Sequence, residues 1–355
     1  MVPDHPCVPG LERPVLLSEY AKLTGVREDD VLAIIGQTKI PSRYYHGQWF
    51  VEAPIEREVS PHDNPKKLRS LDDPTWERLC RRIRDGKCTP FLGAGASFPT
   101  LPLGSSIAAA WAQECEYPGD NPKNLVEVAQ YLAEIEDPLY PKKKILKEFD
   151  GVAPPDFNAP DEPHGVLADL PFPVYLTTNY DDFMVRALKS RGREPHREFC
   201  RWNSLIKNEP SIFDEVDEDR YVVPTVANPL VFHLHGHTIP QSIVLTEDDY
   251  LCFLANIRDD TLLPPRIQAA LSSTTLLFIG YRGADWTFRV LLQGLSMDPR
   301  ESIMYLTPER DFQMSAVTRA LYLAKYYERM SAKIYFGTAW EFAGQLREHW
   351  DAREF

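Results

Sequence analysis

The sequence predicts an α/β fold, in which helices cover both faces of a parallel sheet, preceded by a small N-terminal module. Three observations predict it. Short, nearly continuous apolar segments alternate with helical segments along most of the chain. Small or polar residues directly follow four of these apolar segments. The chain has 355 residues, 43% of them hydrophobic, which is enough for one large domain and a small additional module.

The composition restricts the classes of partner. A net charge of -13 argues against general affinity for nucleic acids or acidic membranes, which need a basic surface. The N-terminal segment is polar and proline-rich, and no apolar run reaches the length of a membrane span. The six cysteines include no C-x-x-C pair. We therefore expect a soluble, cytoplasmic protein with reduced thiols and no membrane partner.

Residues 11–55 form the predicted N-terminal module. Two short helical segments precede a hairpin that turns at His46-Gly47. This order resembles the winged-helix modules of the excisionase and MerR type, which often bind DNA through the second helix. Here that helix, Asp29–Gly36, contains no lysine or arginine, so DNA binding is possible but disfavoured relative to a role in protein assembly. The side chains on the hairpin that favour DNA binding are Arg43, Tyr44 and Trp49.

A charged, proline-rich linker over 56–71 leads to the large domain, 72–350. Its first helix is expected to begin at Asp72 as N-cap, with Pro74 in the first turn, and to end at Gly86. An acidic insertion over 200–229 is expected to be a surface loop. The predicted strands of the sheet are 88–92, 173–177, 230–234, 275–279, 302–306 and 332–336.

Ligands of open parallel sheets bind beyond the carboxyl ends of the strands. The segments GAGAS, TNYDD, HGH and GYRGAD follow four of the predicted strands. In the first, Gly93, Ala94, Gly95 and Ser97 form either a tight packing turn or a cradle for a pyrophosphate, to which a following helix from about Leu103 to Ala112 adds its positive end. The segment lacks the G-x-G-x-x-G spacing and the P-loop lysine, so alone it does not decide between them.

The second and third segments contain candidate catalytic side chains. Asn179 and Asp181 alternate along an extended segment and are expected to face the ligand, while Asp182 caps the next helix. His233, His235 and His237 also alternate, but no further ligands accompany them, so a metal site is disfavoured. His233 is expected to be a buried, hydrogen-bonded histidine. His235, next to Gly236, is the better candidate for a general base.

Together, "FLGAGAS", "TTNYD", "FHLHG" and "FIGYRGAD" resemble the sirtuin family, particularly its bacterial NAD-hydrolysing branch, over roughly 72–345. The resemblance implies a Rossmann-like sheet that binds NAD, with Asn179 and Asp181 at the nicotinamide ribose and His235 as base. The residues that it places around the dinucleotide are Gly93, Ala94, Gly95, Ser97, Thr178, Gly236, Gly280, Arg282 and Asp285.

The sequence also departs from the deacylating sirtuins. It lacks their zinc ribbon of four cysteines, so no zinc is expected. Phe98-Pro99-Thr100 stands where they have an aspartate-phenylalanine-arginine run. Thr178 stands where those sirtuins have a glutamine, and Arg282 stands where they have a serine. An arginine at this position could pair with a phosphate. Protein deacylation is therefore not expected.

The expected function is an NAD glycohydrolase that releases nicotinamide and ADP-ribose. The resemblance implies a role in bacterial antiphage defence through NAD depletion. Such an enzyme needs a gate, for which we expect a homo-oligomer or a partner such as a HerA-type ATPase, with residues 11–55 as the assembly surface. The alternatives are an NAD- or ADP-ribose-binding regulator and an ADP-ribosyltransferase, because the sequence does not separate water from another acceptor.

Overall fold

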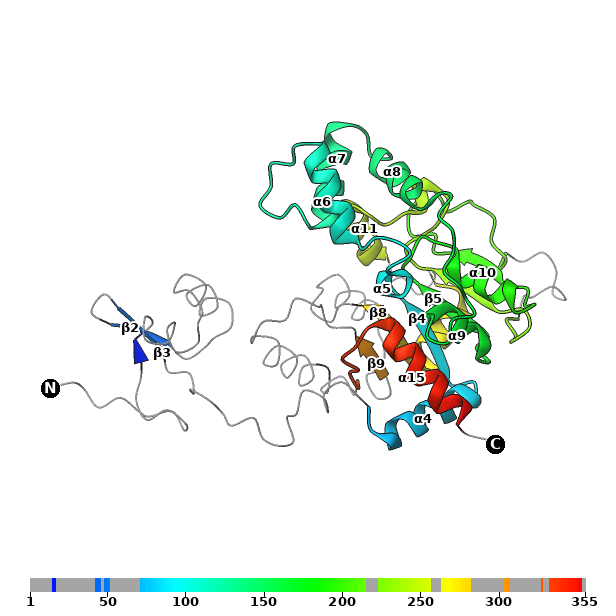
Figure 1. Cartoon of the computed structure of the whole chain (residues 1–355). Coiled ribbons are helices and arrows are strands. Elements are labelled where there is room, and N and C mark those ends of the chain that lie inside the picture. Colours follow the sequence, from blue (N-terminus) through cyan, green and yellow to red (C-terminus); the bar gives the residue numbers. More distant parts are fainter. Residues whose placement is uncertain are drawn as a thin grey trace. The chain divides into compact units, whose positions relative to one another are not determined.

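The chain divides into two compact units, Met1–Lys67 and Leu68–Phe355. Figure 1 shows both units, and their relative placement is not determined. The computed structural model describes residues 15–16, 42–45, 48–51, 71–214, 223–256, 263–281, 303–306, 327 and 332–352.

The described part of the first unit is a small antiparallel sheet. Its strands are ordered β1-β3-β2, and Tyr45 pairs with Gln48 in the antiparallel pair β2-β3. The predicted turn residues His46-Gly47 lie outside the described residues. The two predicted helices of this module lie outside the described residues, so the winged-helix resemblance stays a prediction. The strands are β1 (Val15–Leu16), β2 (Ser42–Tyr45) and β3 (Gln48–Val51).

The second unit is built on a six-stranded sheet in the order β6-β7-β5-β4-β8-β9, with every neighbouring pair parallel. This confirms the predicted α/β class. Strands β5, β6 and β7 lie on one side of β4, with β7 inserted between β5 and the edge strand β6, and the chain then crosses to β8 on the other side of β4. The topological switch point therefore lies beside β4. The strands are β4 (Cys88–Leu92), β5 (Val174–Thr177), β6 (His196–Phe199), β7 (Leu230–His233), β8 (Thr275–Tyr281) and β9 (Ile303–Leu306).

Two details of the predicted sheet are wrong. Residues 332–336 are not a strand. Tyr335 is buried against helices instead, since its ring lies edge-on to Trp76 and Phe342. In contrast, β6 was not predicted, because an edge strand with the sequence HREF lacks the continuous apolar run of the interior strands.

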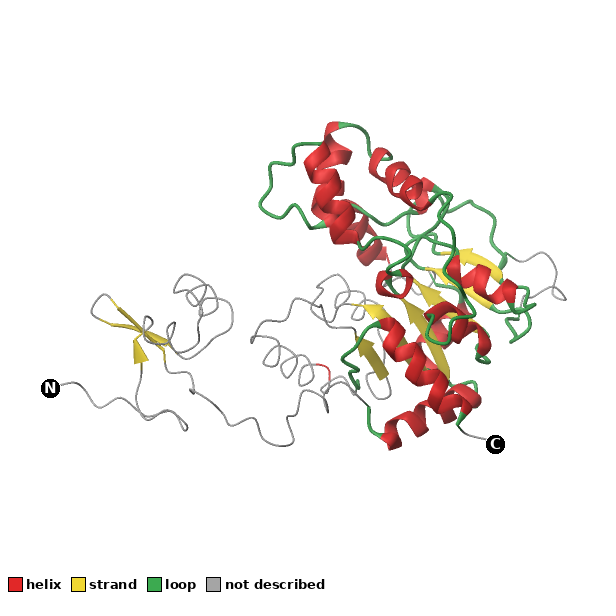
Figure 2. Cartoon of the chain, in the orientation of Figure 1, coloured by secondary structure: helices red, strands yellow, loops and turns green. Residues whose placement is uncertain are grey.

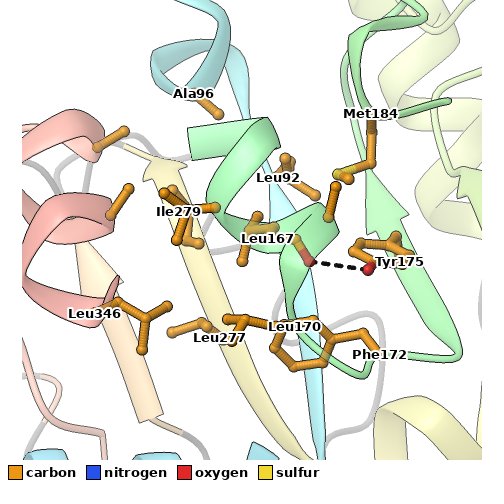
Figure 3. Packing of buried hydrophobic residues seen from close by; sticks show 14 of the residues in the cluster. Leu92, Ala96, Leu167, Leu170, Phe172, Tyr175, Met184, Leu277, Ile279 and Leu346 are labelled. Atoms are coloured by element: carbon orange, nitrogen blue, oxygen red, sulfur yellow. Dashed lines mark hydrogen bonds between the residues drawn. The ribbon is translucent and has the colours of Figure 1, made fainter. Parts of the chain in front are cut away.

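Helices cover both faces of the sheet, as Figure 2 shows. Helices α4, α9, α10 and α15 pack on one face, and α11 and α12 pack on the other. On the first face, Leu346 lies near Leu277, and the Tyr175 hydroxyl donates a 3.0 Å hydrogen bond to the Leu167 carbonyl (Figure 3). The helices are α4 (Asp73–Arg84), α9 (Pro163–Asp169), α10 (Phe183–Ser190), α11 (Glu247–Asn256), α12 (Pro265–Ser273) and α15 (Ala339–Asp351).

Helix α4 shows how the local sequence sets an element's ends. The Asp72 side chain accepts a 3.1 Å hydrogen bond from the Thr75 amide, and Pro74 lies in the first turn. After the helix, Gly86 takes a φ of +66°, which a glycine adopts without strain. No helix in the described parts of the chain has both the length and the apolar character needed to cross a membrane.

A third hydrophobic cluster joins α6, α7 and α8, which Figure 1 shows together at one end of the unit, to the segment that follows β7. A buried ion pair ties this helical group to α11, with Lys142 Nζ 2.6 Å from Asp249 Oδ1. The other Asp249 oxygen accepts hydrogen bonds from two backbone amides at the start of α11. These helices are α6 (Gly104–Glu114), α7 (Leu125–Ile135) and α8 (Tyr140–Phe149).

We predict that Lys142→Met lowers the free energy of unfolding by about 3 kcal/mol or more, because it leaves the Asp249 carboxylate buried without a cation. Lys144→Met is the matched control. Lys144 also lies on α8, 2.6 Å from the exposed Glu114, and both lysines lie 5.5 Å from a tryptophan ring. Lys144→Met is expected to lower the free energy of unfolding by about 1 kcal/mol or less. Urea unfolding measures both, and equal losses would contradict the role assigned to the buried pair.

Candidate functional site

The four predicted strand-end segments lie next to one another. Leu92 at the end of β4 pairs with Thr177 of β5 and with Ile279 of β8, and Thr177 pairs with His233 of β7. Because these strands are parallel and in register, their carboxyl ends share one edge of the sheet. The predicted convergence is therefore present for the segments that begin at Gly93, Thr178, Leu234 and Gly280.

The glycines after β4 are explained by close packing against β8. A Cβ on Gly95 would lie 2.8 Å from the Gly280 Cα, and one on Gly93 would lie 2.9 Å from the Tyr281 ring. Gly280 has a φ of +80°, and a Cβ there would overlap the Ala96 amide nitrogen. The turn is thus a packing turn, the first of the two predicted readings. Ala94 is exposed beside it, and contact with a phosphate stays a proposal.

Ser97 is buried and holds other site residues. Its hydroxyl donates a 2.8 Å hydrogen bond to Asp181 Oδ2 and accepts a 3.1 Å hydrogen bond from Asn179 Nδ2. The hydroxyl proton is therefore used within the protein. The helix that directly follows the glycine turn is the short α5 (Ala94–Ser97), whereas the predicted helix, α6, begins further along the chain.

Asn179 has a fixed side chain. Its Nδ2 donates to the Gly93 carbonyl and to Ser97 Oγ, both at 3.1 Å. These two bonds use both amide protons, and they orient the Oδ1 atom, which makes no hydrogen bond within the described part of the chain. The backbone amide of Asn179 donates to Thr177 Oγ1 at 2.9 Å. The arrangement presents one amide oxygen as a positioned acceptor.

The expected capping role of Asp182 is wrong. Asp182 occupies the N-cap position of α10 but makes no capping hydrogen bond, and it lies 3.6 Å from Arg186 in an ion pair. Asp181 caps instead, since its Oδ1 accepts a 3.0 Å hydrogen bond from the Phe183 amide. An aspartate side chain reaches the amide two residues ahead when the chain turns into a helix. Both Asp181 carboxylate oxygens therefore have partners within the protein.

Thr178 joins the ends of β5 and β8. Its hydroxyl lies 2.7 Å from the Tyr281 hydroxyl, which donates a 2.8 Å hydrogen bond to the Leu92 carbonyl. Since Tyr281 has one hydroxyl proton, Thr178 is the donor to Tyr281. The sequence did not identify Tyr281 as a site residue, because a tyrosine after a buried strand carries no distinguishing pattern. Arg282 and Asp285 lie outside the described residues.

The histidines after β7 have different surroundings. His233 is buried, and its Nδ1 lies 2.9 Å from the Asn179 carbonyl oxygen. His235 is also buried, with its ring edge-on to Tyr250 and Phe253 and its Nε2 without a partner. Gly236 has a φ of +79° and packs against the Ser242 carbonyl, so the turn between the histidines needs a glycine.

Burial lowers the pKa of both His235 and His237 to about 3. Burial also lowers the pKa of His233, and the positive charge of Arg197 adds to that effect. All three imidazoles are therefore neutral at neutral pH. Among the described residues, no three His, Cys, Asp or Glu side chains are grouped so that they would hold a metal ion.

Comparison with known proteins shows which proteins this chain resembles. Residues 173–330 match the family model described as a SIR2-like domain. A protein of Acinetobacter baumannii named NAD(+) hydrolase ThsA is 24% identical over 211 residues, which cover 59% of this chain and 39% of that protein. A protein of the same name from Cytobacillus dafuensis is 27% identical over 211 residues, with 59% and 38% covered. The chain thus spans well under half the length of these relatives.

A solved structure described as "Structural Basis for the Mechanism and Regulation of Sir2 Enzymes" covers 79% of this chain and 98% of its own. The two are 13% identical, with a TM-score of 0.34. The strand order and the register given above, rather than this likeness, establish the fold.

We predict that Gly280→Ala destabilises the protein by at least about 2 kcal/mol more than Gly151→Ala. Both glycines have a positive φ, +80° and +71°, so both alanines carry the same kind of backbone strain. Only Gly280 meets other atoms, because no atom lies within 4 Å of a Cβ on Gly151. Chemical denaturation measures both variants. Equal destabilisation would show that the contact between the two turns is not tight.

We predict that the free energy of unfolding decreases as the pH falls below about 6.5. The pKa of His235 is lowered from 6.5 to about 3 in the folded protein, so between these values the unfolded chain binds one proton more. This proton costs about 1.4 kcal/mol per pH unit. His235→Leu is expected to reduce the slope by that amount in urea unfolding between pH 7 and pH 5. An unchanged slope would show that His235 is protonated in the folded protein.

Proposed function

We propose that this chain, whose residues 173–330 form a SIR2-like domain, hydrolyses NAD to nicotinamide and ADP-ribose. The observation that carries the proposal is the fixed Asn179 amide beside the glycine turn, at the switch point of the sheet. The relatives named NAD(+) hydrolase supply the substrate class. Because the match covers only part of those relatives, the activity is proposed for this chain rather than transferred to it.

The reaction breaks the bond between the ribose carbon and the pyridinium nitrogen. The electron pair of that bond goes to the nitrogen, so nicotinamide leaves as a neutral molecule and needs no acid. Water adds to the ribose carbon and loses a proton to a base. The protein must position the ribose and the water and tolerate the positive charge that develops on the sugar.

Asn179 is placed to do the positioning. Because Gly93 and Ser97 hold its amide protons, the Oδ1 atom accepts a hydrogen bond from the attacking water or from a ribose hydroxyl without reorganisation. Asp181 was expected to face the ligand beside Asn179. Its hydrogen bonds to Ser97 and Phe183 support a positioning role, in which it keeps Ser97 and hence Asn179 in place.

His235 is the proposed base. It is neutral at pH 7, as a base must be, but its low pKa makes it a weak one. Since an oxocarbenium-like centre reacts readily with water, a weak base suffices to take the proton as water adds. The dinucleotide pyrophosphate is proposed to lie along the glycine turn, beside the exposed Ala94.

The biological setting is also a proposal. We propose that the enzyme is a gated effector of bacterial antiphage defence, active as a homo-oligomer or with a HerA-type ATPase, and that residues 11–55 contribute an assembly surface. An enzyme that consumes NAD freely is toxic to its own cell, and this is the reason to expect a gate. No zinc is proposed, because the sequence contains no C-x-x-C pair from which the four-cysteine ribbon of the deacylating sirtuins could be built.

We predict that Asn179→Ala and His235→Ala each reduce nicotinamide release from NAD at least about 100-fold, because each removes a group that acts on water or ribose. Asn121→Ala, an exposed asparagine between α6 and α7, is the control and is expected to match the wild type. Chromatography of nicotinamide and ADP-ribose measures turnover, and circular dichroism checks folding. Nicotinamide without free ADP-ribose would indicate a transferase. Full activity in both variants would refute the site.

A further inference from the structure

On the side of Asn179 away from the glycine turn, two buried polar atoms have no hydrogen-bond partner in the described part of the chain. His233 is 1% exposed, and its Nε2 has no hydrogen-bond partner. The Nε of Arg197, on the neighbouring strand β6, is also buried without a partner. A buried polar atom without a partner costs about 1–3 kcal/mol, so native proteins retain one mainly where a ligand or a water completes it.

The hydrogen bond at the other ring nitrogen fixes the chemistry of His233. The Asn179 carbonyl only accepts, so the Nδ1 of His233 carries the proton. The ring is neutral, because burial and the positive charge of Arg197 lower its pKa well below 6.5. The Nε2 atom therefore presents a bare lone pair, which accepts a hydrogen bond and cannot donate one.

Arg197 supplies the opposite property close by. It pairs with Val231, two residues before His233 on β7, so its side chain and that of His233 share a face of the sheet. The positive charge of Arg197 acts on the imidazoles of His233 and His237. The negative charges of Asp181 and Asp182 act on the Arg197 guanidinium. Even so, the guanidinium makes no hydrogen bond or ion pair with any residue in the described part of the chain.

This combination selects the kind of group that fits. A donor and a bare acceptor on neighbouring strands are complementary to a hydroxyl, which donates one hydrogen bond and accepts others. A phosphate or carboxylate would meet the lone pair of His233 unfavourably, since neither donates a proton when ionised. A metal cation would be repelled by the guanidinium.

We propose that Arg197 and His233 together hold one hydroxyl of the nicotinamide-bearing ribose, with His233 accepting its proton and Arg197 donating to its oxygen. The proposal rests on the proposed NAD hydrolysis. It makes both residues positioning residues for the sugar, next to the Asn179 amide that acts on the reacting carbon. In the absence of substrate, a water molecule satisfies the same two atoms.

Two variants separate this role from a structural one. In His233→Asn, the shorter amide keeps a donor at the position of Nδ1, and with it the hydrogen bond to the Asn179 carbonyl, but loses the acceptor at Nε2. Arg197→Met keeps the apolar length and loses every donor. Because Arg197 makes no hydrogen bond or ion pair with the residues that the structure describes, Arg197→Met is expected to unfold at the same temperature as the wild type or a higher one. A large fall in that temperature would assign Arg197 to structure.

The test measures kcat/KM for nicotinamide release from NAD and from two analogues, which lack the 2′- or the 3′-hydroxyl of the nicotinamide ribose. We expect each variant to lose about tenfold with NAD, the size of one hydrogen bond to a charged or buried group. With one of the two analogues, the kcat/KM of the wild type is expected to be about tenfold lower than with NAD. On that analogue the variants are expected to lose less than about twofold further, because the hydroxyl and its partner act as a pair.

Two results would overturn the inference and leave NAD hydrolysis standing. One is that the loss of kcat/KM from the substitution multiplies the loss from the missing hydroxyl with both analogues. The other is that the variants match the wild type with NAD. If His233→Asn does not fold, Arg197→Met alone decides. If the wild type releases no nicotinamide, the proposed function fails, and calorimetry with ADP-ribose, which carries the same ribose, decides the inference. A Kd about tenfold weaker in both variants than in Asn121→Ala supports it. Equal Kd values, or no binding by the wild type, overturn it.

Discussion

Direct backbone contact between the turn after β4 and the end of β8 sets the geometry of the whole site. Gly95 and Gly280 meet without intervening side chains, and the Gly93 amide donates to the Ile279 carbonyl at 2.9 Å. This contact fixes the Gly93 carbonyl, which in turn orients Asn179. The packing and functional interpretations of the glycine turn are therefore compatible, because the tight turn holds the Asn179 amide that we propose to act in catalysis.

The polar groups of the site divide into two kinds. On the β4 side they satisfy one another, in the chain of contacts from Gly93 through Asn179 and Ser97 to Asp181. On the β7 side they do not. Three of the four buried side-chain atoms that lack a partner in the described part of the chain lie there, on Arg197, His233 and His235. The polar groups on the β4 side are thus preorganised, and those on the β7 side lack partners. This arrangement suits a site in which a ligand supplies the missing hydrogen bonds on the β7 side.

The sequence was sufficient for the α/β class, the interior strands and the edge of the sheet where the site lies. These follow from short-range patterns, namely apolar runs and the small residues after them. It was not sufficient for contacts between distant segments. The hydrogen bond between Thr178 and Tyr281 depends on how the ends of β5 and β8 meet in space. The hydrogen bond that Asp181 accepts from the Phe183 amide is local, but two adjacent aspartates precede α10 and the sequence does not choose between them as the cap. Likewise, the edge strand β6 has too few apolar residues to be recognised, although it carries Arg197.

The last described helix, α15, has a consequence for synthesis of the chain. Its Phe342 stacks on Trp76 of α4, with ring centroids 5.3 Å apart, and Leu346 is fully buried on the same face of the sheet. That face stays open until residues 339–351 have left the ribosome, because these side chains complete its core. Until then, the core beneath β4 and β8 lacks the side chains of α15. The proposed NAD-binding site therefore rests on a core that stays incomplete until this helix has been synthesised.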